Sequence, residues 1–442
     1  MQTAELSVTS IAAGGDGVAR LPDGRVAFVA GGLPGDVVRA EFVDTGKPFV
    51  KCRLGAVVES SEHRVTPPCA LAACGRCGGC PLACLSYAGQ LDAKRCFLTD
   101  ALVRIGKLDE ALVESVVGEC VASPVQWGWR NKVEFEVGQD MSGRLALGMH
   151  ARGGDFVALA ECKLAPSPLE SAPRALAGAL RYISEREDLG LLRVGLRHSN
   201  RTGSTEVALW TKPGRFPRAA TANILPQSLP ANHVGVSRVL VKGDGAARRV
   251  SGTESLSGRG FWREEAGGLS FAVSAPSFFQ VNTPAAELLA DAVLDALRPG
   301  GMDRVFDLYS GVGLFTLPLS EGAGSIVAVE MEGSSVRDLR RNLEHAGCVA
   351  DVVGGDVARE LGGLGHADKV VADPPRSGLG PDVVRALVDA RPGTIACVSC
   401  DPATLARDVA GLVVGGYRLL RATPIDLFPQ TAHVECVAVL KR

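Results

Sequence analysis

The sequence predicts an α/β protein in three parts: a small β-barrel, a central α+β domain and a C-terminal domain with a mainly parallel sheet. Three observations lead to this prediction. The chain has 442 residues, which is too long for one ordinary domain. Its first 60 residues alternate apolar and polar positions between closely spaced Gly and Pro turns. From about residue 270, short strand-like apolar runs alternate with helical segments.

The expected domain boundaries follow these changes of pattern. Residues 1–60 contain five strand-like runs, which is typical of a small barrel. Residues 61–270 hold a cysteine-rich stretch, a helical stretch and strand-like runs between Gly- and Ser-rich connectors. Residues 271–442 contain the strand–helix alternation that indicates βαβ units, and they end in a closing strand.

Composition argues against a membrane protein and leaves nucleic-acid binding open. The chain is 46% hydrophobic, but it has no run of ~18 uncharged apolar residues. The N-terminus lacks the basic and apolar regions of a signal peptide, so we expect a cytoplasmic protein without a membrane partner. A net charge of −2 does not indicate a nucleic-acid binder. Residues 121–260 nevertheless carry 19 Lys and Arg against 12 Asp and Glu, which is compatible with one basic face.

Five of the thirteen cysteines crowd into one short stretch. They are Cys69, Cys74, Cys77, Cys80 and Cys84. In a reducing compartment such crowding favours a metal or cluster site over disulfides. Four thiolates fit either a [4Fe–4S] cluster or a structural zinc ion, and the spacing alone slightly favours zinc, which is the commoner site.

Three strand ends in the C-terminal part indicate a nucleoside-binding pocket. The first strand runs into DLYSGVG at residues 307–313, where glycines let the backbone turn tightly beside a ligand. The second ends in Glu330, whose carboxylate can accept hydrogen bonds from ribose hydroxyls. On these two features NAD fits as well as any other nucleoside cofactor. A later strand ends in DPPR at residues 373–376, a rigid extended turn at the same edge of the sheet.

A cysteine and two possible bases lie at the last strand ends. Cys400 follows the fifth strand and precedes a helix, whose N-terminus is expected to lower the pKa of the thiol. Cys397 lies further inside the strand and is expected to be core packing. His433 and Glu435 alternate on the closing strand and are expected to share a face, so the residues alone do not rank them. A thiol beside a base is the arrangement of a covalent catalyst.

Several motifs, taken in order, resemble the RNA uracil-5-methyltransferase family, especially its ribosomal RNA branch. They are FFQVN, FDLYSGVGLFTLPL, DPPRSGL, VSCDPATLARD and DLFPQTAHVECVAVL, and the resemblance extends over nearly the whole chain. It implies a Rossmann-like class I methyltransferase domain over residues 271–442, an OB-like TRAM barrel that binds RNA over residues 1–60, and S-adenosylmethionine as the methyl donor. The implied partner is RNA, with 23S ribosomal RNA favoured over transfer RNA. The alternatives are a transfer-RNA enzyme and an inactive RNA-binding relative.

The resemblance also assigns roles to site residues. It implies that Cys400 adds to carbon 6 of uracil, so that carbon 5 can attack the methyl group, and that Glu435 then removes the carbon-5 proton. Phe278 matches an aromatic that stacks on the target base. Leu314 stands where Asn is common and cannot make an amide hydrogen bond, so it is left out of the expected site. The implied methyl-donor contacts are Gln280, Tyr309, Glu330 and Asp373.

The same resemblance implies a [4Fe–4S] cluster in residues 61–270. Its ligands fall on Cys69, Cys77, Cys80 and Cys162. More residues separate Cys69 from Cys77 than is usual in the family, so Cys74 is the alternative first ligand. The stretch WRNK at residues 129–132 matches a central family motif, and we expect it either to contact RNA phosphates or to shape the central domain.

Overall fold

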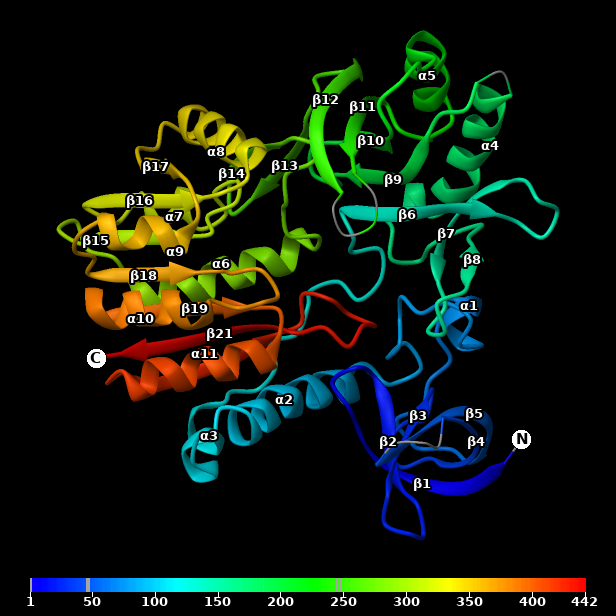
Figure 1. The fold of residues 1–442 in the computed structure, drawn as a ribbon, viewed down its shortest axis with the longest axis horizontal. Helices are drawn as coiled ribbons and strands as arrows, with labels where there is room; N and C mark the ends of the chain where they lie inside the picture. The colour runs from blue at the N-terminus through cyan, green and yellow to red at the C-terminus, as the bar shows by residue number, and fades with distance from the viewer. Residues whose placement is uncertain (1, 45–47, 186, 244, 246–247) are drawn as a thin grey trace.

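The computed structural model describes all residues except 1, 45–47, 186, 244 and 246–247, and its ribbon divides into three parts (Figure 1). The first part is a barrel, the second a mixed sheet with helices on one face, and the third a mainly parallel sheet with helices on both faces. The predicted fold class is confirmed. No helix among the described residues is long and apolar enough to cross a lipid bilayer.

The barrel consists of β1 (Thr3–Ile11), β2 (Asp16–Arg20), β3 (Val26–Ala30), β4 (Val37–Asp44) and β5 (Phe49–Glu59). It closes because β1 pairs with both β2 and β4, while β5 lies between β3 and β4. Alternate residues such as Leu6 and Val8 point inward, as the period of a strand requires. Arg152 of the central part pairs with Asp16 of β2 and holds the barrel against its neighbour.

Three helices follow the barrel: α1 (Ala70–Ala73), α2 (Tyr87–Arg104) and α3 (Glu110–Val116). α2 and α3 do not pack with the central sheet, although they lie within residues 61–270. Leu98 and Leu102 of α2 and Val113 of α3 share one hydrophobic cluster with the C-terminal sheet, and α2 lies along α11 (Pro402–Val414) (Figure 1). The expected range 61–270 is therefore not one packing unit, because the apolar face of α2 is buried against the C-terminal part.

The central part contains a seven-stranded sheet in the order β12-β11-β10-β9-β6-β7-β8. Its strands are β6 (Lys132–Gln139), β7 (Leu145–His150), β8 (Phe156–Ala158), β9 (Leu191–His198), β10 (Ser204–Thr211), β11 (His233–Lys242) and β12 (Arg249–Ser257). The turn η1 (Ser167–Leu169) and the helices α4 (Ala172–Ser184) and α5 (Arg218–Gln227) contribute to the hydrophobic cluster of this sheet. A hairpin, β13 (Trp262–Ala266) and β14 (Leu269–Val273), leads to the last part.

The C-terminal sheet has the order β17-β16-β15-β18-β19-β21-β20. Its strands are β15 (Arg304–Leu308), β16 (Ser325–Glu330), β17 (Asp351–Gly354), β18 (Lys369–Ala372), β19 (Thr394–Ser399), β20 (Arg418–Ile425) and β21 (Glu435–Lys441). The first five in this order are parallel, and β21 is antiparallel to both β19 and β20. The parallel strands therefore end at one edge of the sheet, which is where α/β folds bind ligands.

Helices cover both faces of this sheet, so its strands are buried on both sides. α6 (Thr283–Leu297) and α8 (Gly333–Ala346) pack in clusters on one face, and α10 (Gly380–Ala390), α11 and α2 pack on the other. The short elements α7 (Thr316–Leu319), α9 (Val357–Glu360) and η3 (Leu361–Gly363) complete the connections.

Candidate functional site

A glycine turn follows β15 and is held in place by the carboxylate at the end of β16. Glu330 accepts hydrogen bonds from the backbone N–H of Gly311 at 2.9 Å and of Glu332 at 2.6 Å. A Cβ atom at Gly313 would lie 2.4 Å from Leu317, so only glycine lets the turn pack so closely. Tyr309 has a φ of +64°, which a non-glycine residue rarely adopts. Glu330 and Tyr309 thus lie at the expected edge, and Glu330 also shapes the loop beside it.

Two further acids face this edge from β15 and the end of β18. Asp307 is buried, and burial together with the nearby Asp373 raises its pKa to about 7. Its Oδ2 accepts a hydrogen bond from Thr316 at 2.5 Å, and its Oδ1 has no partner among the described residues. Burial also raises the pKa of Asp373 to about 7. The sequence did not single out Asp307, although it opens the DLYSG motif. Its position near the end of a predicted strand was the sequence feature that could have identified it as a site residue.

The segment before α6 presents two expected site residues at the same edge. Gln280 is only 5% exposed, and its side-chain Oε1 has no hydrogen-bond partner in the described part of the chain. Buried acceptors in proteins are nearly always hydrogen-bonded, so this oxygen is a candidate to accept a hydrogen bond from a ligand. Phe278 is 58% exposed, whereas the adjacent Phe279 is buried with its ring 5.9 Å from that of Trp262. Phe279 therefore anchors the segment, and Phe278 remains free to contact a ligand.

Asn131 fixes the position of Gln280 from the central part. Its Nδ2 donates to the backbone oxygen of Gln280 at 2.8 Å and to Thr283 at 2.9 Å. The neighbouring Lys132 pairs with Glu134 at 2.8 Å. Arg130 is largely buried rather than placed on the surface. Of the two roles expected for the WRNK stretch, the described contacts favour shaping the site over contacting phosphates.

Cys400 directly follows β19, and Glu435 begins the neighbouring strand β21. The antiparallel register of these strands ends with the pair Ser399 and Cys436, so Cys400 and Glu435 each lie next to this last pair. Glu435 is 1% exposed, and none of the described residues supplies a hydrogen bond to its Oε1. Burial, with a contribution from Asp373, raises the pKa of Glu435. The pair therefore combines a thiol with a carboxyl group that can take up a proton.

The expected lowering of the Cys400 pKa by a helix N-terminus is wrong. Burial and the carboxylate of Glu435 raise the pKa of Cys400 to about 11, although Arg376 acts in the opposite direction. Asp401 caps α11 and accepts hydrogen bonds from the N–H groups of Ala403 and Thr404. These donors of the helix terminus are therefore satisfied by Asp401 rather than by the thiol.

His433 does not share a strand face with Glu435, contrary to expectation. It lies in the loop before β21 and is exposed, whereas Glu435 begins the strand and is buried. Its ring lies 6.0 Å from that of Phe428, and its Nε2 lies 3.5 Å from Arg376. Partial burial and the neighbouring Arg376 lower the pKa of His433. The two possible bases are thus in different surroundings.

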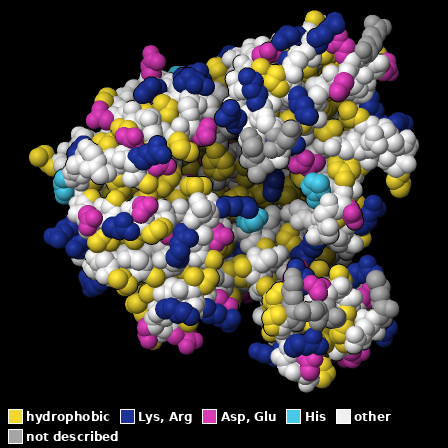
Figure 2. All heavy atoms as spheres, in the orientation of Figure 1, with side chains coloured by type: hydrophobic (Ala, Val, Ile, Leu, Met, Phe, Trp, Pro, Cys, Tyr) yellow, Lys and Arg dark blue, Asp and Glu magenta, His cyan; other side chains and the backbone are white. Residues whose placement is uncertain are grey.

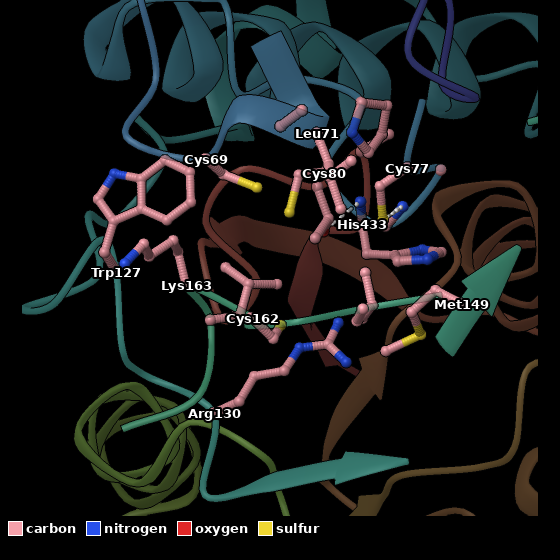
Figure 3. A pocket seen from close by; sticks show the side chains of 18 of the residues that line it. Cys69, Leu71, Cys77, Cys80, Trp127, Arg130, Met149, Cys162, Lys163 and His433 are labelled. Carbon is pink, nitrogen blue, oxygen red and sulfur yellow. Dashed lines mark hydrogen bonds between the residues drawn. The ribbon is translucent and has the colours of Figure 1, made fainter. Parts of the chain in front are cut away.

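Four cysteines, three from residues 69–80 and one from the central part, line one cavity of about 370 Å³ (Figure 3). They are Cys69, Cys77, Cys80 and Cys162. Cys74 is exposed at the end of α1 and does not line the cavity. Gly78 is required between two of the thiols, because a Cβ atom there would lie 2.8 Å from the oxygen of His150. All thirteen cysteines are free, and within the described ranges no three His, Cys, Asp or Glu side chains form a ready metal-binding group.

The surroundings of these thiols include one buried cation. Arg130 lines the cavity, and its Nε has no hydrogen-bond partner among the residues that the structure describes. Burial lowers the pKa of Arg130, while the nearby Cys162 and Cys80 act in the opposite direction. Burial also raises the pKa of Cys77, Cys80 and Cys162. The donor set suits a soft metal or cluster, and the guanidinium would balance its negative charge.

Known proteins resemble this chain in sequence and in structure. The family model for tRNA (Uracil-5-)-methyltransferase matches residues 365–442, and that for the TRAM domain matches residues 1–47. An uncharacterized RNA methyltransferase of Gloeobacter violaceus is 37% identical, covering 100% of this chain and 97% of its own length. One of Nitratidesulfovibrio vulgaris is 35% identical, covering 99% and 96%.

A solved structure resembles the whole fold. It is the tRNA (uracil-54, C5)-methyltransferase of Pyrococcus abyssi in complex with S-adenosyl-L-homocysteine. The match has a TM-score of 0.74 and 26% sequence identity, and it covers 99% of this chain and 100% of the other.

We predict that Glu330→Ala and Asp373→Ala weaken the binding of S-adenosyl-L-homocysteine about tenfold or more. A hydrogen bond to a charged group contributes about 1.5–3 kcal/mol, and each 1.4 kcal/mol is about a factor of ten. Because the pKa of Asp373 is about 7, its carboxyl group is largely neutral below that pH and ionised above it. The effect of Asp373→Ala should therefore grow between about pH 6 and about pH 8.

Isothermal titration calorimetry measures these affinities. Asp351→Ala is the matched control, because Asp351 is exposed at the opposite, amino end of β17. Unchanged affinity in both site variants would place the cofactor elsewhere.

Proposed function

The chain belongs to the RNA uracil-5-methyltransferase family, and from this premise we propose that it methylates carbon 5 of a uridine in ribosomal RNA with S-adenosylmethionine. The observation that carries the proposal is that Cys400 directly follows β19 and Glu435 begins β21, so both lie next to the hydrogen-bonded pair Ser399–Cys436, and that Glu435 is near enough to raise the pKa of Cys400. The glycine turn, Glu330 and Asp373 lie at the same sheet edge, at the ends of β15, β16 and β18. A nucleophile and a base therefore stand beside a nucleoside pocket.

The proposed reaction begins with the thiolate of Cys400. It adds to carbon 6 of uracil, and the electrons of the C5=C6 bond move to give an enolate with carbanion character at carbon 5. Carbon 5 attacks the sulfonium methyl group, and the bond from sulfur to that methyl breaks to release S-adenosylhomocysteine. Glu435 takes the carbon-5 proton, the C5=C6 double bond re-forms and the thiolate leaves. Glu435 then returns its proton to solvent, which balances the lost sulfonium charge.

Glu435 is the proposed base because it lies next to Cys400, beside the last hydrogen-bonded pair of β19 and β21. The proton to be removed is on the carbon next to the one that bears the sulfur atom, so the base must lie beside the thiol. His433 lies in the loop before β21, against the ring of Phe428, and lines the cysteine cavity instead.

The remaining expected residues are proposed to hold the two substrates. Glu330 and Asp373 would bind hydroxyl or ammonium groups of the methyl donor, and the free Oε1 of Gln280 would accept a further hydrogen bond from it. Tyr309 would contact the same ligand from the glycine turn. The exposed ring of Phe278 would stack on a uracil that has been flipped out of the RNA.

A hollow between the three parts is the proposed path of the RNA. In the space-filling view the hollow is largely hydrophobic inside, and Lys, Arg and His side chains lie at places around its rim (Figure 2). Such side chains attract phosphates without reading sequence. The barrel borders this hollow, and its match to the TRAM model supports a role in binding RNA.

The four cysteines that line the cavity are proposed to hold a [4Fe–4S] cluster. They are Cys69, Cys77, Cys80 and Cys162. The proposal rests on three thiols of residues 69–80 and the thiol of Cys162, which line the same cavity, and on the buried guanidinium of Arg130 beside them. A bound cluster would cross-link these segments, and it takes no part in the methyl transfer described above. Zinc is the alternative for the same donor set.

Transfer RNA is the second candidate substrate, because the Pyrococcus abyssi protein, which matches the whole chain, is a transfer-RNA enzyme. We predict that ribosomal RNA from a strain lacking this protein has lost 5-methyluridine at one position. Mass mapping of ribosomal and transfer RNA from the parent and deletion strains tests this. Re-expression of the parent chain should restore the mark, and Cys400→Ala should not. Loss of the mark from transfer RNA alone would establish the second candidate.

We predict that Cys400→Ala abolishes turnover without forming a covalent adduct with RNA. Glu435→Gln should still add to uracil and transfer the methyl group. It should then stall, because the thiolate cannot leave while the carbon-5 proton remains. The expected species is a protein–RNA complex that survives denaturing electrophoresis and carries label from the methyl donor.

His433→Gln is the matched comparison for Glu435→Gln. If Glu435 is the base, His433→Gln turns over and accumulates no adduct. The assignment is wrong if His433→Gln accumulates the adduct and Glu435→Gln turns over normally.

We predict that the anaerobically purified protein is brown and carries roughly four irons per chain. Cys80→Ser should lose the iron, because Cys80 lines the cavity. Cys74→Ser is the matched control and should retain it, because Cys74 is exposed and outside the cavity. Elemental analysis and the visible absorption spectrum measure both. Colourless protein with stoichiometric zinc would establish a zinc site instead.

A further inference from the structure

The loop between β20 and β21 connects the cysteine cavity with the buried carboxyl group of Glu435. This loop, residues 426–434, follows Ile425 and leads directly into Glu435. Three of its residues, Thr431, Ala432 and His433, line the cavity that also holds the four thiols (Figure 3). The placement of Glu435 therefore depends on what holds this loop.

Two hydrogen bonds between Gln90 and Gln430 hold the middle of the loop. The Nε2 of Gln90 on α2 donates to the Oε1 of Gln430 at 3.0 Å, and the backbone N–H of Gln430 donates to the Oε1 of Gln90 at 2.9 Å. Both side chains are buried. Because the alternative to these bonds is an unsatisfied buried amide, the pair strongly favours one geometry of the loop.

The same pair reaches the cysteine segment through Leu82, which lies two residues after Cys80. The N–H of Leu82 donates to the backbone oxygen of Gln430 at 3.0 Å, and its own oxygen accepts from Gln90 Nε2 at 3.2 Å. Gln90 Nε2 also donates to the oxygen of Leu85 at 2.9 Å. The turn after the thiols, the helix α2 and the loop before Glu435 thus share one buried network.

Two further observations indicate that the loop is held rather than relaxed. Gln430 has a φ of +72°, a conformation that a residue with a side chain keeps only when its surroundings impose it. Lys94, one turn further along α2, is buried and donates to Asp426 at 2.5 Å and to the oxygen of Phe428 at 3.0 Å. Helix α2 therefore contacts the loop at two places, through Gln90 and through Lys94.

We propose that Gln90 and Gln430 are positioning residues through which the cysteine segment places Glu435 for proton removal. The proposal rests on the proposed function, since it concerns one step of that reaction. Cys400 follows β19, and the proposed methyl-donor residues lie on other segments. The segment that carries Gln280 contacts the loop through Asn282, whose Nδ2 donates to the oxygen of Leu427 at 3.0 Å, and this bond does not involve Gln90 or Gln430. Disturbing the pair should slow the removal of the carbon-5 proton and spare both thiol addition and methyl transfer.

The test uses Gln90→Met and Gln430→Met, which keep the length of the side chain and remove its amide. Turnover should fall about ten- to a hundredfold, as expected for a misplaced catalytic group. The KM for S-adenosylmethionine should stay within about twofold, because the methyl-donor site is untouched. Both variants should accumulate the methylated covalent protein–RNA adduct, as Glu435→Gln does. A double variant should be no slower than the slower single variant, because the two residues act as one unit.

Gln227→Ala is the control, because Gln227 is exposed at the end of α5 in the central part, and it should behave as the parent. If Gln90→Met does not fold, Gln430→Met carries the test, since it leaves the contacts of Gln90 with Leu82 and Leu85 in place. The inference is overturned if these variants turn over like Gln227→Ala, or if they lose activity without accumulating the adduct. A parent protein that does not methylate uridine would instead overturn the proposed function.

Discussion

The hydrogen-bonded register between β19 and β21 is the constraint on which the candidate site depends. These strands are neighbours in the sheet but are separated in sequence by α11 and β20. A shift of one residue would turn Glu435 to the other face of the sheet, because side chains alternate along a strand. The pairs from Thr394 and Lys441 to Ser399 and Cys436 follow without interruption, so the register is strongly specified. A thiol and a buried carboxyl group both lie next to the last pair of this register as a result.

Several acids are buried at this edge of the C-terminal sheet, and they suit a cationic ligand better than an anionic one. The pKa values of Asp307 and Asp373 are both raised to about 7, and that of Glu435 is raised as well. A carboxylate is costly to bury without a partner, so each group tends to hold its proton. S-adenosylmethionine carries a sulfonium and an ammonium group, which would stabilise the ionised forms. Taken by themselves, the glycine turn and Glu330 are also compatible with NAD. NAD carries two negatively charged phosphates, which the ionised acids at this edge would repel.

The segment between the barrel and the central sheet links parts that are far apart in sequence. Its first half carries three of the thiols that line the cavity, and its second half forms α2 on the C-terminal sheet. The buried ion pair of Lys94 and Asp426 joins α2 to the loop between β20 and β21. Breaking one member of such a pair leaves an unpaired buried charge, so the contact is sensitive to any change in α2. The cysteine cavity and the strand β21 are thus connected through α2 and the loop between β20 and β21.

The sequence by itself determined the fold class and most of the C-terminal edge. Parallel strands bring their carboxyl ends to one side of a sheet, so the order of strand-end motifs was enough to gather Glu330, Asp373 and Cys400. Tertiary structure alone decided the packing of α2, the separation of His433 from Glu435 and the burial of Arg130. It also decided the raised pKa of Cys400, which the position of the residue before a helix had predicted in the opposite direction. These properties depend on desolvation and on contacts between residues distant in sequence, which local patterns do not encode.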